Sequence, residues 1–280
     1  MRNEWAVDSD LFIFSDAAKN EGAIPAVRQV REVLRTATGF KTVNIVERER
    51  NLGLANSIAA GVTQLCEATG RAIVLEDDLV TAPNFLRYMN EALDKYATQP
   101  DVYSISGYSF TNDSAGIDST YFLGITSSWG WATWGDKWKI FERNREALAE
   151  KLKSIEFRKR FNYDNSYDYS RLAENQLAGK TDSWAIYWYF CIFLRAGLTL
   201  YTGKSLVKNI GFDGTGTHCD DGGNDVLLNP FEVEFTDDIF EKKEIRKAVQ
   251  TVLRGQYPRP SLYSRIRAVG TQLWKVPQWP

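Results

Sequence analysis

Short apolar runs alternate with longer amphipathic segments through the first hundred residues, and this alternation constrains the fold most strongly. The apolar runs occupy residues 11–14, 42–46, 72–75 and 102–106. Between them lie segments whose apolar residues recur at helical spacing, as in 54–66. Parallel strands need long crossover connections, which are usually helices. The pattern therefore predicts an α/β domain with a mostly parallel sheet flanked by helices.

Beyond residue 107 the chain becomes rich in Gly, Ser, Trp and Tyr. Two further helical stretches are expected there, over 136–160 and 169–178. No internal repeat or linker of biased composition divides the chain. We expect one domain over 1–236, in which residues 1–107 form a ligand-binding half and 108–236 form the far wall of a cleft. A helical tail over 237–280 would follow.

The charge balance argues against nucleic acid as a partner. The chain carries 34 basic and 36 acidic residues, a net charge of −2, so it has no overall positive field for a phosphate backbone. The longest apolar run, 184–194, is shorter than the roughly 20 residues that a membrane-spanning helix needs. No secretory signal opens the sequence. These features predict a cytoplasmic protein.

Cysteine usage agrees with a reducing compartment. Cys66, Cys191 and Cys219 form no Cys-x-x-Cys pair and no even set, so we expect no disulfide. Segment 261–275 mixes basic and apolar residues. It could rest on the anionic inner face of the cell membrane as a peripheral contact, although the pattern favours a plain packing helix.

Three adjacent carboxylates, Glu76, Asp77 and Asp78, follow the apolar run 72–75. In open α/β sheets, ligands bind beyond the carboxyl ends of the strands. Alternation along an extended chain points Glu76 and Asp78 the same way and Asp77 the other. A divalent cation or buried basic partners would relieve the repulsion between these carboxylates, and oxygen ligands suit Mg²⁺ or Mn²⁺. The other interpretation is an acidic loop that caps the next helix.

Five segments, in one order along the chain, resemble the GT-A glycosyltransferases. Residues 73–88, with the sequence IVLEDDLVTAPNFLRY, are similar to the Asp-x-Asp region of these enzymes, especially to the Glu-Asp-Asp-Leu version in the N-acetylglucosaminyltransferase I-like group. Residues 51–58, NLGLANSI, resemble the Asn-x-Gly segment of bacterial family 2 sugar transferases. The other three segments resemble an aromatic acceptor-side loop, a catalytic-base segment and a closing loop, at 127–134, 182–188 and 209–218. The resemblance implies the GT-A fold, which is a Rossmann-like α/β architecture.

This resemblance implies a metal-dependent inverting glycosyltransferase. Such an enzyme moves a sugar from a nucleotide-diphosphate donor to a glycan or lipid-linked acceptor, here in surface polysaccharide synthesis. By the resemblance Asp78 would bind Mn²⁺ or Mg²⁺ next to the donor diphosphate, and Glu76 and Asp77 would contact the donor sugar and ribose. The ion would offset the charge that develops on the departing diphosphate.

The remaining roles are carried over onto polar residues of the other segments. Asn51 and Asn56 flank a glycine at a helix start, where amide donors can hold the nucleotide, and an ordinary strand-to-helix turn explains them equally well. Asp182 would take the proton of the acceptor hydroxyl, or merely cap the helix that follows it. His218, the only histidine, would bind the metal or the diphosphate, or be a plain surface or packing residue.

Trp129, Trp131 and Trp134 crowd into six positions. Apolar sugar faces stack on such rings, but aromatic side chains also dominate protein cores. We expect one of the three to contact the acceptor, with Trp129 and Trp131 as the candidates, and the others to be structural.

The resemblance fails near the start of the chain. Members of the family usually have an apolar strand, in the middle of the sheet, before the strand that matches 11–16. We expect this usual first strand to be missing, which would leave two sheet edges unpaired and weaken donor binding. A degenerate transferase fold that acts as a carbohydrate-binding or scaffold protein is therefore an alternative. A nucleotidyltransferase is another, although no Gly-rich basic loop for a triphosphate is visible early in the chain.

Overall fold

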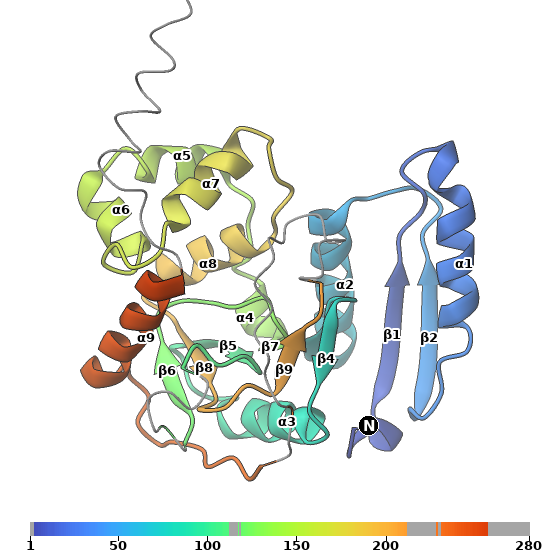
Figure 1. Cartoon of the computed structure of the whole chain (residues 1–280), viewed down its shortest axis with the longest axis horizontal. Helices are drawn as coiled ribbons and strands as arrows, with labels where there is room; N and C mark the ends of the chain where they lie inside the picture. The colour runs from blue at the N-terminus through green and yellow to red at the C-terminus, as the bar shows by residue number, and fades with distance from the viewer. Residues whose placement is uncertain (1–2, 112–116, 118, 212–227, 229–230, 257–280) are drawn as a thin grey trace, which may run out of the picture.

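The computed structural model describes residues 3–111, 117, 119–211, 228 and 231–256. These residues form an α/β protein with one five-stranded and two two-stranded sheets (Figure 1). The five-stranded sheet contains, in spatial order, β3 (Arg71–Val74), β7 (Trp131–Trp134), β5 (Val102–Ser106), β8 (Leu198–Tyr201) and β6 (Tyr121–Leu123). The small sheets pair β1 (Asp10–Ser15) with β2 (Thr42–Glu47), and β4 (Leu79–Thr81) with β9 (Val207–Asn209).

All four predicted strands are confirmed, as β1, β2, β3 and β5. The prediction of a mostly parallel sheet is wrong. In the five-stranded sheet β5 and β8 are parallel, whereas β3–β7, β5–β7 and β6–β8 are antiparallel. The reason is β7, a strand from the aromatic-rich second half, which lies between β3 and β5 and runs antiparallel to both. The sheet is therefore mixed.

Strands β1 and β2 are parallel, and within the described residues they pair only with each other. In Figure 1 they stand apart from the five-stranded sheet. Helix α2 (Leu54–Thr69) contacts both parts, because a Cβ on its Gly61 would come within 3.1 Å of the Phe14 ring of β1, and its Cys66 packs with Ala72 of β3. Among the described residues, no strand pairs with the other edge of β1.

The helices lie on both sides of the sheets. Besides α2 they are α1 (Ile24–Leu34), α3 (Phe85–Lys95), α4 (Gly135–Trp138), α5 (Arg145–Lys151), α6 (Ile155–Phe161), α7 (Tyr169–Leu177), α8 (Ala185–Phe193) and α9 (Lys243–Gln256), with short 3₁₀ turns at Ala6–Asp8 and Glu21–Ala23. The stretch predicted as one helix over 136–160 contains three. Asn144 and Ser154 start the second and third, because their side chains accept hydrogen bonds from the backbone N–H groups of Ala147 and Phe157. None of the described helices is long and apolar enough to cross a membrane.

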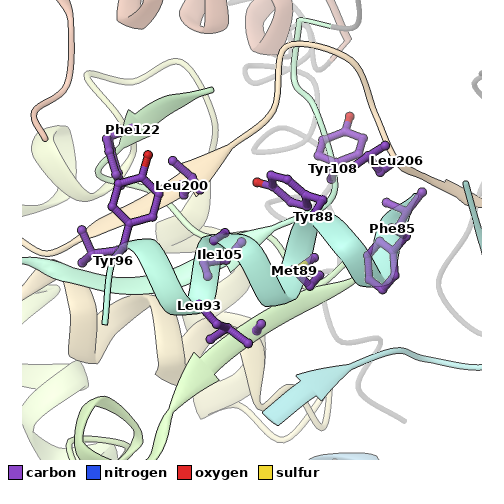
Figure 2. Close-up of a cluster of buried hydrophobic side chains, with 14 of the residues drawn as sticks. Phe85, Tyr88, Met89, Leu93, Tyr96, Ile105, Tyr108, Phe122, Leu200 and Leu206 are labelled. Carbon is purple, nitrogen blue, oxygen red and sulfur yellow. The ribbon is translucent and has the colours of Figure 1, made fainter. Parts of the chain in front are cut away.

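Helix α3 covers the five-stranded sheet. Its Phe85, Met89 and Leu93 are four residues apart and fully buried, so they form one apolar stripe. Figure 2 shows this stripe with Ile105 of β5 and Leu200 of β8 around it. A hydrogen bond of 2.9 Å from the Trp134 indole to the Leu93 carbonyl joins β7 to the same core, so Trp134 is a structural residue.

Helix α9 packs against the second half of the molecule. Its Val249 and Leu253 are buried in a core with Phe161 of α6 and Tyr189 of α8. The predicted tail, 237–280, therefore contains a helix that shares a core with the preceding residues, while segment 261–275 lies outside the described residues. Cys66 and Cys191 are buried free thiols, and Cys219 is also outside the described part.

Candidate functional site

The acidic triplet lies in the connection from β3 to β4. Glu76 and Asp78 are half-buried and Asp77 is exposed, which agrees with the predicted alternation. Burial raises the pKa of Glu76 from its ordinary value of 4.5 to about 7. The charges of Asp78 and Asp77 raise it too, while hydrogen bonding to Trp184 acts in the opposite direction. Glu76 therefore titrates near neutral pH.

The pairing of β4 with β9 fixes the position of Asp78. Its Oδ2 accepts a hydrogen bond of 2.9 Å from the Asn209 side chain, and its carbonyl accepts one of 2.8 Å from the Ile210 backbone. A Cβ on Gly211 would come within 3.0 Å of the same Oδ2. The segment that carries His218 thus leaves β9 beside Asp78, but His218 itself lies outside the described residues.

Asp78 can serve as a metal ligand at a site where the protein itself supplies only one or two of the ligands. The described His, Cys, Asp and Glu residues form no group of three or more that could surround an ion. Mg²⁺, however, is commonly held by one or two carboxylates, with water and substrate phosphates as the other ligands. Asp78, whose hydrogen bonds from described residues go to Oδ2 and the carbonyl oxygen, fits that mode.

The start of α2 is held by Asp16 at the end of β1. The Asp16 carboxylate accepts hydrogen bonds from the backbone N–H groups of Leu52 (2.9 Å) and Gly53 (3.0 Å). Asn51 donates from its side chain to the Ala17 carbonyl at 2.7 Å. Gly53 has a φ of 75°, a conformation that favours glycine. The contacts of Asn51 are those of a strand-to-helix turn.

Asp182 reaches the same end of α2. Its Oδ2 accepts a hydrogen bond of 3.2 Å from the Ala55 backbone, and its Oδ1 lies 3.5 Å from Nη2 of Arg143. Nη1 of Arg143 donates to Oδ1 of Asn56 at 2.6 Å. The structure therefore brings Asn56 and Asp182 together through an arginine that the sequence did not single out.

The alternative prediction, that Asp182 caps the helix that follows it, is wrong, because Asp182 hydrogen-bonds to a different helix. Near the start of α8 it is Ser183 whose Oγ accepts from the Ile186 backbone, at 3.4 Å. Asp182 instead supplies an acceptor to α2, which is distant in sequence. Asp182 thus stabilises a helix end, but not the end next to it in the chain.

Trp131 is a core residue rather than a substrate contact. Its side chain is 0% exposed, and its ring stacks on Trp184 with a centroid distance of 4.8 Å. Trp138 and Trp188 close the other sides at 5.8 and 6.1 Å. The prediction that Trp131 binds substrate is corrected because neighbouring indoles occupy the space around its ring.

Trp129 lines a cavity of about 200 Å³ in the second half of the molecule. Ser183, next to Asp182, lines it as well, and so does Leu253 of α9. Trp184 connects the cavity with the acids, since its chain neighbours Ser183 and Ala185 line the cavity while its own side chain interacts with Glu76.

The predicted site residues fall into separate places. Asn51, Asn56 and Asp182 gather at the start of α2, Glu76 and Asp78 lie in the connection from β3 to β4, and Trp129 lines the cavity. Sequence reasoning missed Asp16, Arg143 and Trp184. Of these, only Asp16 carries a recognisable signal, an acid at the end of an apolar run. The chain matches no protein-family model and no curated protein.

Proposed function

We propose that this protein is a metal-dependent GT-A glycosyltransferase that moves a sugar from a nucleotide-diphosphate donor to a glycan or lipid-linked acceptor. The position of Trp184 is the main support. Its indole interacts with the acidic residue Glu76, and its chain neighbours line an aromatic cavity. A sugar transferase needs acidic residues, which serve the leaving diphosphate, next to a cavity that takes the acceptor.

Asp78 is the residue that we assign to the donor diphosphate. The other obvious anion site, the start of α2, is already used, because Asp16 and Asp182 accept hydrogen bonds from Leu52, Gly53 and Ala55. Bound Mn²⁺ or Mg²⁺ supplies positive charge that offsets the charge developing on the leaving group. Asp78 would hold this ion, and the exposed Asp77 would be available to the ribose.

Transfer with inversion is a single displacement. The acceptor hydroxyl oxygen attacks the anomeric carbon, the bond from that carbon to the diphosphate oxygen breaks, and a base takes the hydroxyl proton. We assign the proton to Asp182, because the next residue, Ser183, lines the cavity where an acceptor would lie. Arg143 holds the Asp182 carboxylate at this border.

Binding of nucleoside diphosphates with Mn²⁺ tests the proposal. A panel of uridine, guanosine, thymidine and cytidine diphosphates should contain one that raises the melting temperature only when Mn²⁺ is present. A ligand at a hundred times its Kd adds about 2.7 kcal/mol to the free energy of unfolding. Asp78→Asn should abolish this effect, and Asp8→Asn, at an exposed aspartate outside the site, should retain it. A panel without any metal-dependent shift in the wild type contradicts the proposal.

Two substitutions of Asp182 separate its structural role from catalysis. Asp182→Ala should lower the free energy of unfolding by about 1 kcal/mol, because the Ala55 N–H loses its acceptor, and Asp182→Asn should lower it less. Both should slow sugar transfer by about 10²–10⁴-fold, since neither can accept the proton. Urea unfolding and transfer of radiolabelled sugar measure the two effects. Wild-type transfer by Asp182→Asn would leave Asp182 with the structural role alone.

A carbohydrate-binding protein is the second candidate, and the aromatic cavity favours it. Such a protein would bind sugar without nucleotide and would not hydrolyse a nucleotide sugar over hours. Hydrolysis of a nucleotide sugar, followed over hours with Asp78→Asn as control, therefore distinguishes the two functions.

A further inference from the structure

The cavity lined by Trp129 has a distinct chemistry. Its walls include six aromatic rings, those of Tyr108, Phe110, Trp129, Tyr167, Tyr169 and Tyr189. Four hydroxyl side chains stand among them, on Thr126, Ser127, Ser128 and Ser183. No charged side chain is found among the described residues that line it. We propose that this cavity binds one neutral sugar ring, a hexose or N-acetylhexosamine, and discriminates against sugars that carry a carboxylate or phosphate.

The aromatic walls are braced before any ligand arrives. The Trp129 ring meets Tyr108 edge-on, with centroids 4.8 Å apart, and Tyr108 meets Phe110 at 5.2 Å. A second group is equally close, since Tyr169 lies 4.6 Å from Tyr167 and 4.5 Å from Tyr189. Rings held in this way need little further ordering when a ligand stacks on them, so less binding free energy is lost.

The hydroxyl groups favour a sugar over an apolar chain. Ser127 Oγ accepts a hydrogen bond of 3.2 Å from the Trp129 backbone, which orients the hydroxyl at the foot of that ring. A hydroxyl both donates and accepts, and so matches the hydroxyls of a sugar. An isoprenoid chain would instead cover these polar groups without bonding to them, which is unfavourable.

The absence of charge among the described lining residues sets the preference for a neutral ligand. A carboxylate or phosphate taken out of water needs a cationic partner, and these lining residues offer none. Asp182, adjacent to Ser183, would add repulsion from the border of the cavity. Neutral sugars meet neither difficulty.

The size of the cavity limits the ligand to one ring. About 200 Å³ is below the roughly 300–1,000 Å³ that is typical of pockets for drug-sized ligands. Leu253 closes one side, and α9 is held there because Arg246 and Gln250 contact Asp164 at 2.9 and 3.2 Å. Leu172, which is 40% exposed, stands at the rim, where the rest of a longer glycan would leave. The inference deepens the proposed function, and rests on it in one respect, the assignment of the bound sugar ring as the acceptor.

Binding of simple methyl glycosides tests the inference without any transfer reaction. Methyl glucoside, methyl galactoside and methyl N-acetylglucosaminide are titrated by saturation-transfer NMR, with methyl glucuronide and choline as charged comparators. Each titration is run with and without uridine diphosphate and Mn²⁺. At least one neutral glycoside should bind about tenfold more tightly than the glucuronide, and more tightly than choline, which an aromatic cage for cations would prefer. Trp129→Ala should weaken its binding about tenfold through loss of stacking. Trp5→Ala, at a tryptophan that is 37% exposed and outside the cavity, should not change it.

Three results would overturn the inference. They are equal or tighter binding of the glucuronide or choline, unchanged binding by Trp129→Ala, and no binding of any neutral glycoside in either condition. Circular dichroism of Trp129→Ala verifies that the variant is folded, and Leu172→Trp, which should block the rim from an exposed position, gives a second test of location. Failure of the nucleotide panel with sugar binding intact would remove the proposed function and leave the cavity assignment standing.

Discussion

Trp131→Ala is expected to lower the free energy of unfolding by about 3–5 kcal/mol. The side chain is fully buried among Trp184, Trp138 and Trp188, and these rings cannot collapse into the space that its indole leaves. Urea unfolding followed by far-ultraviolet circular dichroism measures the change, since the signal does not depend on the tryptophan that is removed.

Trp129→Ala is the matched control for this loss. Trp129 is in the same segment but only half-buried, so its removal should cost about 1 kcal/mol. Trp131→Phe should fall between the two, because it keeps an aromatic ring and also removes a buried Nε1 that has no hydrogen-bond partner in the described part of the chain. Equal losses from Trp131→Ala and Trp129→Ala would contradict the assignment of Trp131 to the core.

Glu76→Gln is expected to stabilise the metal-free protein at pH 8 and to have little effect near pH 4.5. The fold raises the pKa of Glu76 from 4.5 to about 7, which means that the folded state disfavours the charged form. The stability that goes with this shift is fully present below pH 4.5 and is lost as the pH rises through 7. The loss above pH 7 is roughly 3 kcal/mol at about 1.36 kcal/mol for each unit of pKa. Glutamine has no charge to bury, so Glu76→Gln avoids this loss of stability.

Urea unfolding of both proteins at the two pH values, with EDTA to remove metal ions, measures this effect. Glu91→Gln, at an exposed position, serves as the control for replacing a carboxylate by an amide. A Glu76→Gln difference that is the same at pH 4.5 and pH 8 would contradict the raised pKa.

The sequence was sufficient to predict these strands, but it was not sufficient to predict which strands pair with one another. Strands β1, β2, β3 and β5 follow from apolar runs, which are local signals. The position of β7 in the sheet does not follow from a local signal. Its partners Arg71–Val74 lie far upstream, and its own residues, Trp131–Trp134, were interpreted as an aromatic loop. The split of 136–160 into three helices was recognisable in principle from Asn144 and Ser154, which are common helix-capping residues.

The site was predictable where neighbours in sequence are neighbours in space. The alternation of Glu76, Asp77 and Asp78 is such a case. The contact of Asp182 with Ala55 spans 127 positions, so no local pattern announces it. The cavity draws residues from Tyr108 to Leu253, and without the fold these are scattered aromatic and hydroxyl side chains. Trp131 was misassigned for a related reason, since burial depends on the distant rings of Trp184 and Trp188.

The separate sheet of β1 and β2 has a consequence for local opening. Two strands alone are only marginally stable in water. Their described attachments to the rest include α2 and a 2.8 Å hydrogen bond from the Glu4 backbone to the Pro83 carbonyl. The amide protons of β1 should therefore exchange with deuterium before those of β5, which is hydrogen-bonded on both sides. Since the carboxylate of Asp16 leaves with β1, each such opening would also free the N–H groups of Leu52 and Gly53 just before α2, while Asp182 would still hold the N–H of Ala55.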